Sequence, residues 1–403
     1  MDIIMSSGTA ILERSDATSV NQAMDTLTAQ WYNAVVTGLG LSPDQFQLYQ
    51  GPNSAMNTSQ DMWNLFNAVP PASINNYYNP SQVNNLASDY GLILSALVPS
   101  SNSSFQNCMG DYYSKWTSYF SDHDPKTWDA QGVSDLFSSW AIRNAPGQAG
   151  CVTGLTNIYI NPINIAVNKF ASAKEQYAWN KTVDAMKSAL AGGASKSFSM
   201  NSQTASSDVE HTWANGRTSF FFDIFSFGGG GGYDQLTTKT SSAGLKIDAQ
   251  FDKVTTFTAG PLAANDPNNP VLSDYSAWYE SAALAKAYTT KDNTVWNNQS
   301  STTWDKAFGS NGFLQRTTSS IVVADGITIK MTSNASYSSS ERTEIQAAAK
   351  AGIWPFFSAS GGGGSTTDIK FNDDGSFTAT TTIALGNPQI LGILQSPIAN
   401  SFS

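Results

Sequence analysis

The sequence has few charged residues, few histidines and only two cysteines. Charged side chains make up 13% of the 403 residues, about half of the ~25% usual in soluble domains. Ser, Thr, Asn and Gln must therefore cover the surface, and these groups lose less free energy than ions on leaving water. The hydrophobic content of 40% predicts a globular protein. The formal net charge is −10 and no basic stripe is present, which argues against nucleic acid as a partner.

Enzyme signatures are also scarce. His123 and His211 are the two histidines of the chain, too few for a zinc site built on several histidines, and H-E-x-x-H is absent. The nucleophile elbow G-x-S-x-G and the phosphate loop G-x-x-x-x-G-K do not occur. We therefore predict a non-enzymatic protein with no catalytic residue, no metal site and no cofactor.

Targeting signals are missing from the sequence as well. The start, MDIIMSSGTAILERSD, has no basic n-region and no apolar run of signal-peptide length. No segment approaches the ~20 consecutive apolar residues of a membrane-spanning helix. We expect a protein that is made soluble, is secreted or released, and acts outside the cell. Cys108 and Cys151 permit either one disulfide or two buried thiols.

Residues 1–192 have the apolar spacing of helices. In the best case, Asn161 caps a helix with Pro162 in its first turn, and an apolar stripe continues to Gly192. This pattern predicts one helix of about 30 residues over 162–191. Shorter helices are expected near 59–68, 81–97, 104–121 and 132–144.

After Gly193 the apolar period changes to two, which predicts half-buried strands. The alternation is clearest over 245–252 and 327–338. A further pair of strands flanks NDDG at 372–375, which predicts a hairpin whose turn supplies a positive φ. One helix is expected at about 274–289.

Residues 198–261 and 331–388 form a predicted internal repeat with an offset of 133. Each copy has a polar strand, an acidic cluster, an aromatic segment, a glycine run and an alternating strand. We thus predict an α+β protein: an all-helical domain at 1–192, followed by two related antiparallel β-rich repeats at 193–265 and 321–403. A helix-containing connector at 266–320 joins the repeats. This order is broadly similar to the layout of bacterial insecticidal crystal toxins, a likeness of architecture without a shared motif.

The two aromatic segments with their glycine runs are the most unusual stretches, at 220–232 and 353–364. Exposing an aromatic side chain costs roughly 2–3 kcal/mol, so the segments must be covered in the stored protein. One interpretation makes them core elements; the other makes the glycines hinges from which the segments swing out. The second interpretation gives as membrane-insertion candidates Phe220, Phe221, Phe222, Phe225, Phe227, Trp354, Phe356 and Phe357. It gives as hinge candidates Gly228, Gly229, Gly230, Gly231, Gly232, Gly361, Gly362, Gly363 and Gly364.

Ser/Thr-rich alternating strands point to membrane insertion. Eight of the eighteen residues at 365–382 are Ser or Thr; uncharged polar residues suit the lumen face of a transmembrane strand, and ~9–11 residues span a bilayer. We expect a pore-forming, toxin-like protein of insecticidal or cytolytic type that oligomerises at a membrane surface or cell-surface receptor. The alternatives are a self-assembling structural protein and a carbohydrate-binding module. In the latter, Trp296 and Trp304 are the platforms for a glycan.

Overall fold

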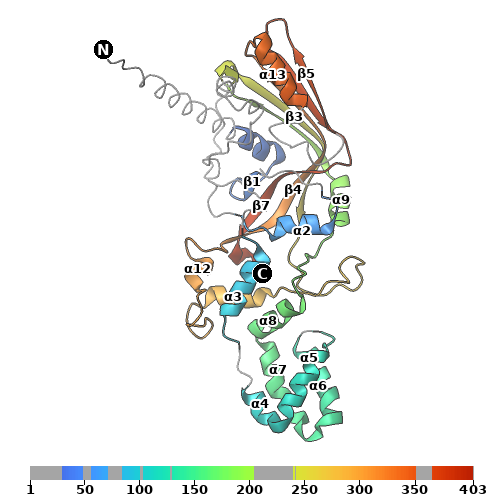
Figure 1. The fold of residues 1–403 in the computed structure, drawn as a ribbon, viewed down its shortest axis with the longest axis vertical. Coiled ribbons are helices and arrows are strands. Elements are labelled where there is room, and N and C mark those ends of the chain that lie inside the picture. Colours follow the sequence, from blue (N-terminus) through green and yellow to red (C-terminus); the bar gives the residue numbers. More distant parts are fainter. Residues whose placement is uncertain are drawn as a thin grey trace, which may run out of the picture. The chain divides into compact units, whose positions relative to one another are not determined.

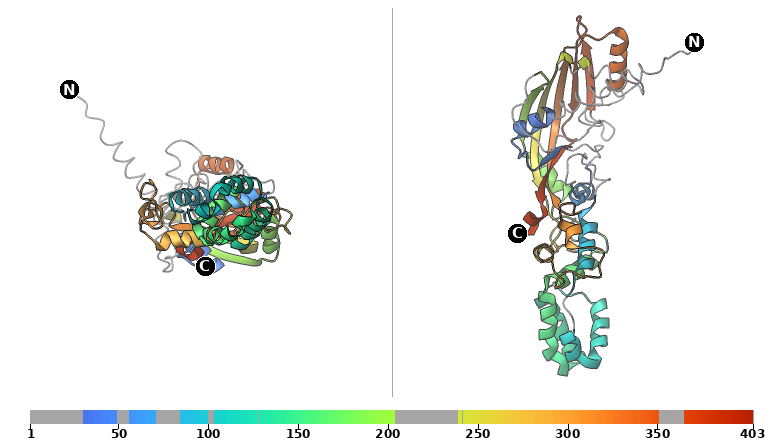
Figure 2. Two further views of the ribbon diagram at one scale, coloured as in Figure 1. Left: turned by 90° about the horizontal axis from the view of Figure 1, so that it is seen from below. Right: turned by 90° about the vertical axis from the view of Figure 1, so that its left-hand side faces the viewer.

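The computed structural model describes residues 30–48, 56–70, 84–99, 103–127, 129–203, 239–240, 242–350 and 365–402. The chain divides into two compact units (Figures 1 and 2). Unit 1 comprises Met1–Val83, Lys181–Ala259 and Thr318–Ser396, and unit 2 comprises Asn84–Asn180, Gly260–Thr317 and Pro397–Ser403. Each unit thus collects segments that are distant in the sequence.

One seven-stranded sheet dominates unit 1 (Figure 2). Its strands follow the order β1-β7-β4-β3-β2, while β6 pairs with β4 and β5 pairs with β6. The bounds are β1 Phe46–Leu48, β2 Ala194–Asn201, β3 Leu245–Thr258, β4 Arg316–Ser333, β5 Ser365–Phe371, β6 Phe377–Ile383 and β7 Gln389–Pro397.

The core of unit 1 lies on one face of this sheet. Along β3, Leu245, Ile247, Ala249 and Phe251 are buried while their neighbours are more exposed, so the predicted alternation is confirmed. The helical residues 30–39 contribute buried apolar side chains to the same cluster. The other helices of this unit are α2 Ser59–Asn67, α9 Val183–Ala191 and α13 Ser339–Lys350.

The long strand β4 contains a position that only glycine occupies without strain. Gly326 has φ +63°, and a Cβ there would lie 2.5 Å from Oδ2 of Asp252. The preceding Asp325 is buried, and its carboxylate accepts hydrogen bonds from the backbone N–H groups of Gly386 and Asn387. These contacts tie the middle of β4 to the turn between β6 and β7.

Unit 2 is mainly helical. Its helices are α3 Leu86–Ala96, α4 Ser103–Met109, α5 Tyr113–Asp122, α6 Ala130–Asn144, α7 Val152–Ile160, α8 Pro162–Ser172, α11 Ser281–Thr289 and α12 Trp304–Phe308. Cys108 at the end of α4 and Cys151 before α7 form a disulfide, which decides between the two alternatives that the sequence left open. Closing a loop of this length stabilises a fold by roughly 4 kcal/mol in the chain-entropy model.

The α+β fold class is confirmed, but two expectations within it are wrong. The predicted helix over 162–191 is two helices, α8 and α9, because the chain leaves the helix at Lys174 and Glu175, both with positive φ. Trp179 is then buried against Trp278, and its backbone forms a bridge with Pro261. The helix predicted over 274–289 starts only at Ser281.

The domain boundaries expected from the sequence differ from the division into units. The described residues before 192 are helical except for short segments that include β1, and they are shared between the two units. Residues 260–317, which contain most of the expected connector, belong to unit 2, and β2 to β7 form one sheet of unit 1.

Candidate functional site

Two chain segments interrupt the sheet of unit 1 at corresponding places. Insert 1, residues 202–244, connects the end of β2 to the start of β3, and insert 2, residues 334–376, connects the end of β4 to the start of β6. Each insert is 43 residues long. In each case the two strands that flank the insert pair antiparallel with one another. Each insert therefore occupies the position of a hairpin loop.

Both inserts leave from the same end of the sheet. Asn201 of β2 pairs with Lys246, the second residue of β3, and Leu245 pairs with Ser333 at the end of β4. Ser333 in turn pairs with Phe377, the first residue of β6. The four strand ends that flank the inserts thus form one row across β2, β3, β4 and β6.

The candidate residues predicted from the aromatic and glycine patterns all fall within these inserts and lie outside the described residues. They are Phe220, Phe221, Phe222, Phe225, Phe227, Gly228, Gly229, Gly230, Gly231 and Gly232 in insert 1, and Trp354, Phe356, Phe357, Gly361, Gly362, Gly363 and Gly364 in insert 2. Their proposed roles stay predictions.

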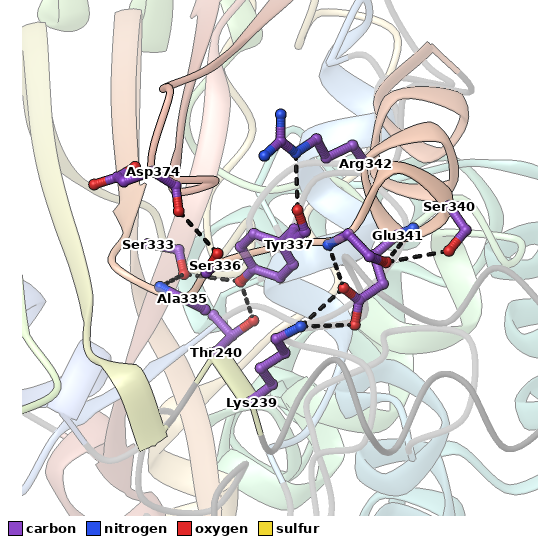
Figure 3. A network of polar contacts seen from close by, with 11 residues as sticks. Lys239, Thr240, Ser333, Ala335, Ser336, Tyr337, Ser340, Glu341, Arg342 and Asp374 are labelled. Carbon is purple, nitrogen blue, oxygen red and sulfur yellow. Dashed lines mark hydrogen bonds and ion pairs between the residues drawn. The ribbon is translucent and has the colours of Figure 1, made fainter.

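A hydrogen-bonded network joins the two inserts around Tyr337 (Figure 3). The Tyr337 ring is 2% exposed, and its hydroxyl lies 2.6 Å from Thr240 Oγ1 and 2.8 Å from Ser333 Oγ. Burial raises the pKa of the Tyr337 phenol, so this hydroxyl stays protonated and hydrogen-bonding across the physiological range. Insert 1 supplies Thr240, insert 2 supplies Tyr337, and Ser333 belongs to β4.

An ion pair reinforces the contact between the inserts. Lys239 Nζ of insert 1 lies 2.8 and 2.9 Å from the two carboxylate oxygens of Glu341 in α13. The same ammonium lies 5.4 Å from the centre of the Tyr337 ring, within cation–π distance. We call Lys239, Thr240, Ser333, Tyr337 and Glu341 the Tyr337 network.

Two opposing effects act on the pKa of Glu341 in this ion pair. Partial burial raises its pKa, but hydrogen bonds from Lys239 and from the backbone and hydroxyl of Ser338 outweigh that effect and leave the pKa below its usual value. The N–H of Ser338 donates to the Glu341 carboxylate over 2.7 Å at the start of α13. Glu341 therefore both caps α13 and holds Lys239.

Hydrogen bonds also join the first residues of insert 2 to its last residues, in the turn before β6. Ser336 Oγ donates to the carbonyl of Asp374 over 2.8 Å, and the N–H of Tyr337 donates to the carbonyl of Gly375. Arg342 Nε donates to the carbonyl of Tyr337 over 2.8 Å. Gly375 has φ +88°, which confirms the positive φ predicted for the NDDG turn. These bonds place α13 beside the β5–β6 hairpin (Figure 1).

Sequence patterns indicated little of this network. Strand periodicity extended the predicted strand to 338, whereas β4 ends at Ser333 and Tyr337 lies in the following loop. The repeat alignment placed Glu341 in its acidic cluster without assigning it a partner. A capping-box pattern, Ser338 followed three residues later by Glu341, is the signal that could have marked the start of α13.

The two predicted glycan platforms lie in unit 2 and differ in exposure. Trp296 is 4% exposed, and its indole N–H donates to the carbonyls of Ala287 and Thr290. A ring this buried has no face for a sugar. Trp304 is half-buried, and Lys291 Nζ lies 3.4 Å from the centre of its ring, so the ammonium covers one face of this indole.

The described part of the chain has neither a metal-binding cluster nor a helix that could span a membrane. No group of three or more His, Cys, Asp or Glu side chains there is arranged to hold a metal ion. No helix among these residues is both long enough and apolar enough to cross a bilayer. No family model matches the chain, and neither a curated protein nor a solved structure is significantly similar to it.

Proposed function

We propose that this protein is a non-enzymatic, pore-forming protein that oligomerises on a membrane and inserts the two 43-residue inserts as β-hairpins. The single observation that carries the proposal is the placement of the inserts: both occupy hairpin positions at one end of one sheet. Insert 1 can extend its two flanking strands without any change in strand order, and insert 2 can do so once β5 leaves its place beside β6.

The length of each insert suits this role. Half of an insert is about 20 residues, and an extended strand of that length spans roughly 65 Å. A transmembrane β-strand needs only ~9–11 residues. Each insert therefore has enough chain to cross a bilayer twice and still leave residues for the link to the sheet.

The composition and spacing of the inserts support the same proposal. Each contains one aromatic segment followed by a glycine run, and the positions of their flanking strands differ by 132 residues, close to the offset of 133 from the sequence alignment. We propose that the inserts and their flanking strands are two copies of one unit. In this proposal the glycine runs are hinges and the aromatic residues enter the lipid.

Oligomerisation and an extracellular site of action complete the proposal. Among the described strands, β1, β2 and β5 each pair with one neighbour, so each offers a backbone edge for another copy. The Cys108–Cys151 disulfide fits an oxidising compartment. The partner would be a membrane surface or a cell-surface receptor, with a glycan as one candidate.

A reversible cross-link across the Tyr337 network tests the proposal. In a Lys239→Cys/Glu341→Cys variant, a photocleavable bis-maleimide would tie the two inserts together. We expect release of dye from vesicles of target-cell lipids to fall at least tenfold after cross-linking and to recover after illumination. The control is Lys246→Cys/Asp248→Cys, which replaces an ion pair within β3 and leaves the inserts untied. Equal dye release with and without the cross-link would show that the inserts do not move.

A further inference from the structure

Unit 2 contains a cavity of about 190 Å³ that the proposed function does not use. It lies among α4, α5, α7 and α8, which Figure 1 shows grouped together. Phe105 and Leu155 are almost completely buried in its wall, as is the indole of Trp116. An enclosed cavity of about 150 Å³ is large enough to bind benzene, so this cavity, which is partly open to solvent, has room for one ring.

The aromatic wall of the cavity is held rigid by its neighbours. The ring of Trp116 packs edge-on against Phe137 at 5.0 Å and lies 5.1 Å from Phe120. The disulfide between Cys108 and Cys151 joins α4 to the segment that leads into α7. A preformed wall lowers the entropy lost when a ligand binds.

The lining residues on α8 include two polar, uncharged side chains. Asn164 and Asn168 are one helical turn apart and both line the cavity, with Val167 between them on the same helix. Asn164 is 8% exposed and Val167 is 39% exposed. None of the described residues that line the cavity carries a charged side chain, so a charged ligand would lose its hydration without gaining a counter-charge there.

We propose that this cavity binds a neutral, single-ring, mostly apolar molecule that carries one hydroxyl or carbonyl group. The ring packs on the wall formed by Phe105, Trp116 and Leu155, and the polar group hydrogen-bonds to a carboxamide of α8. A hexose is a poorer fit, because its several hydroxyl groups would meet a largely apolar lining and remain without hydrogen-bond partners.

Binding of p-cresol, toluene and glucose to the full chain tests this inference, with ligand-observed NMR and calorimetry as the measurements. We expect saturable binding of p-cresol about tenfold tighter than that of toluene, the gain of one hydrogen bond, and no binding of glucose. Equal affinities for p-cresol and toluene, absence of binding by both, or saturable binding of glucose would each overturn the proposed ligand class.

Variants then locate the binding to the cavity. Val167→Phe fills the space and should weaken p-cresol binding at least tenfold, whereas Ile142→Phe, at a residue of α6 that is 71% exposed and does not line the cavity, should leave it unchanged. Asn168→Leu should remove the preference for p-cresol over toluene, and Asn164→Leu is the second variant if the first leaves that preference. A folded Val167→Phe protein that keeps its affinity, or a preference that survives both asparagine variants, would contradict the site.

Discussion

The two inserts have the same length and the same place in the sheet, but they are held differently. Among the described residues, insert 2 closes on itself through the bonds of Ser336, Tyr337 and Arg342. Insert 1 contacts insert 2 through Lys239 and Thr240. The other bonds of its described residues are near its ends, where Ser202 Oγ accepts from the N–H of Leu245, Gln203 donates to the carbonyl of Ala243, and the carbonyl of Ser202 accepts from Gln30.

We expect this difference to produce an order of release. Lys239 and Thr240 of insert 1 are held on insert 2, so loss of the Tyr337 network would release these two residues while the internal bonds of insert 2 remain. A substitution in the β5–β6 turn instead weakens the hydrogen bonds within insert 2. Because Tyr337 also contacts insert 1, we expect such a substitution to affect both inserts. Hydrogen exchange, measured separately for each insert, distinguishes these two effects.

The largest effect is expected from Gly375→Ala. A Cβ at this residue would lie 2.6 Å from Ser336 Oγ, in a backbone with φ +88°, and the strain and the lost Ser336 hydrogen bond together should cost about 3 kcal/mol of unfolding free energy. Exchange should accelerate in both inserts. The control is Gly386→Ala, which has φ +93° but nothing within 4 Å of the added Cβ. Equal losses of stability in the two variants would show that the contact at Ser336 contributes nothing.

An intermediate effect is expected from Tyr337→Phe. The change removes the hydroxyl that joins Thr240 to Ser333 and leaves two polar groups without that partner, at a cost of about 2 kcal/mol. Hydrogen exchange should accelerate in insert 1 more than in insert 2, and dye release from vesicles should become faster.

The matched control for Tyr337→Phe is Tyr90→Phe in unit 2. The Tyr90 hydroxyl is also buried and makes two hydrogen bonds, both to the backbone of Glu280. A similar loss of stability is expected there, without faster dye release. If both variants release dye at the same rate, general destabilisation rather than the Tyr337 network governs the process.

Local rules predicted the strands well. Along β3 and the second half of β4, one face is buried and the other is more exposed. The apolar residues there therefore mostly recur at every second position, and the sequence shows this period directly. The turn at Gly375 was predictable because its conformation depends on residues adjacent in the sequence. Asn161 and Pro162 likewise marked the start of α8, where Asn161 accepts from the N–H of Ile163.

Contacts between distant segments were not predictable from these rules. The break between α8 and α9 depends on residues 178–180, which bond to residues 260–278. Lys239 and Glu341 are 102 residues apart, and with 21 basic and 31 acidic side chains no local pattern selects this pair. Trp296, predicted as a glycan platform, is buried beside α11. Periodicity likewise cannot show that a helix covers a tryptophan in a loop.

The smallest effect is expected from the ion pair, because Lys239 is 37% exposed at its side chain and solvent weakens the attraction. Lys239→Met or Glu341→Gln should cost less than about 1 kcal/mol. The folded pKa of Glu341 lies below its usual value of 4.5, so its contribution is complete above that pH and is lost as the pH falls through the folded pKa. Acid should therefore accelerate exchange in insert 1 of the wild-type protein, once the rates are divided by the intrinsic exchange rate at each pH. In Glu341→Gln the part of this acceleration that comes from the carboxylate should disappear, and an unchanged acid response would show that a different group controls insert 1.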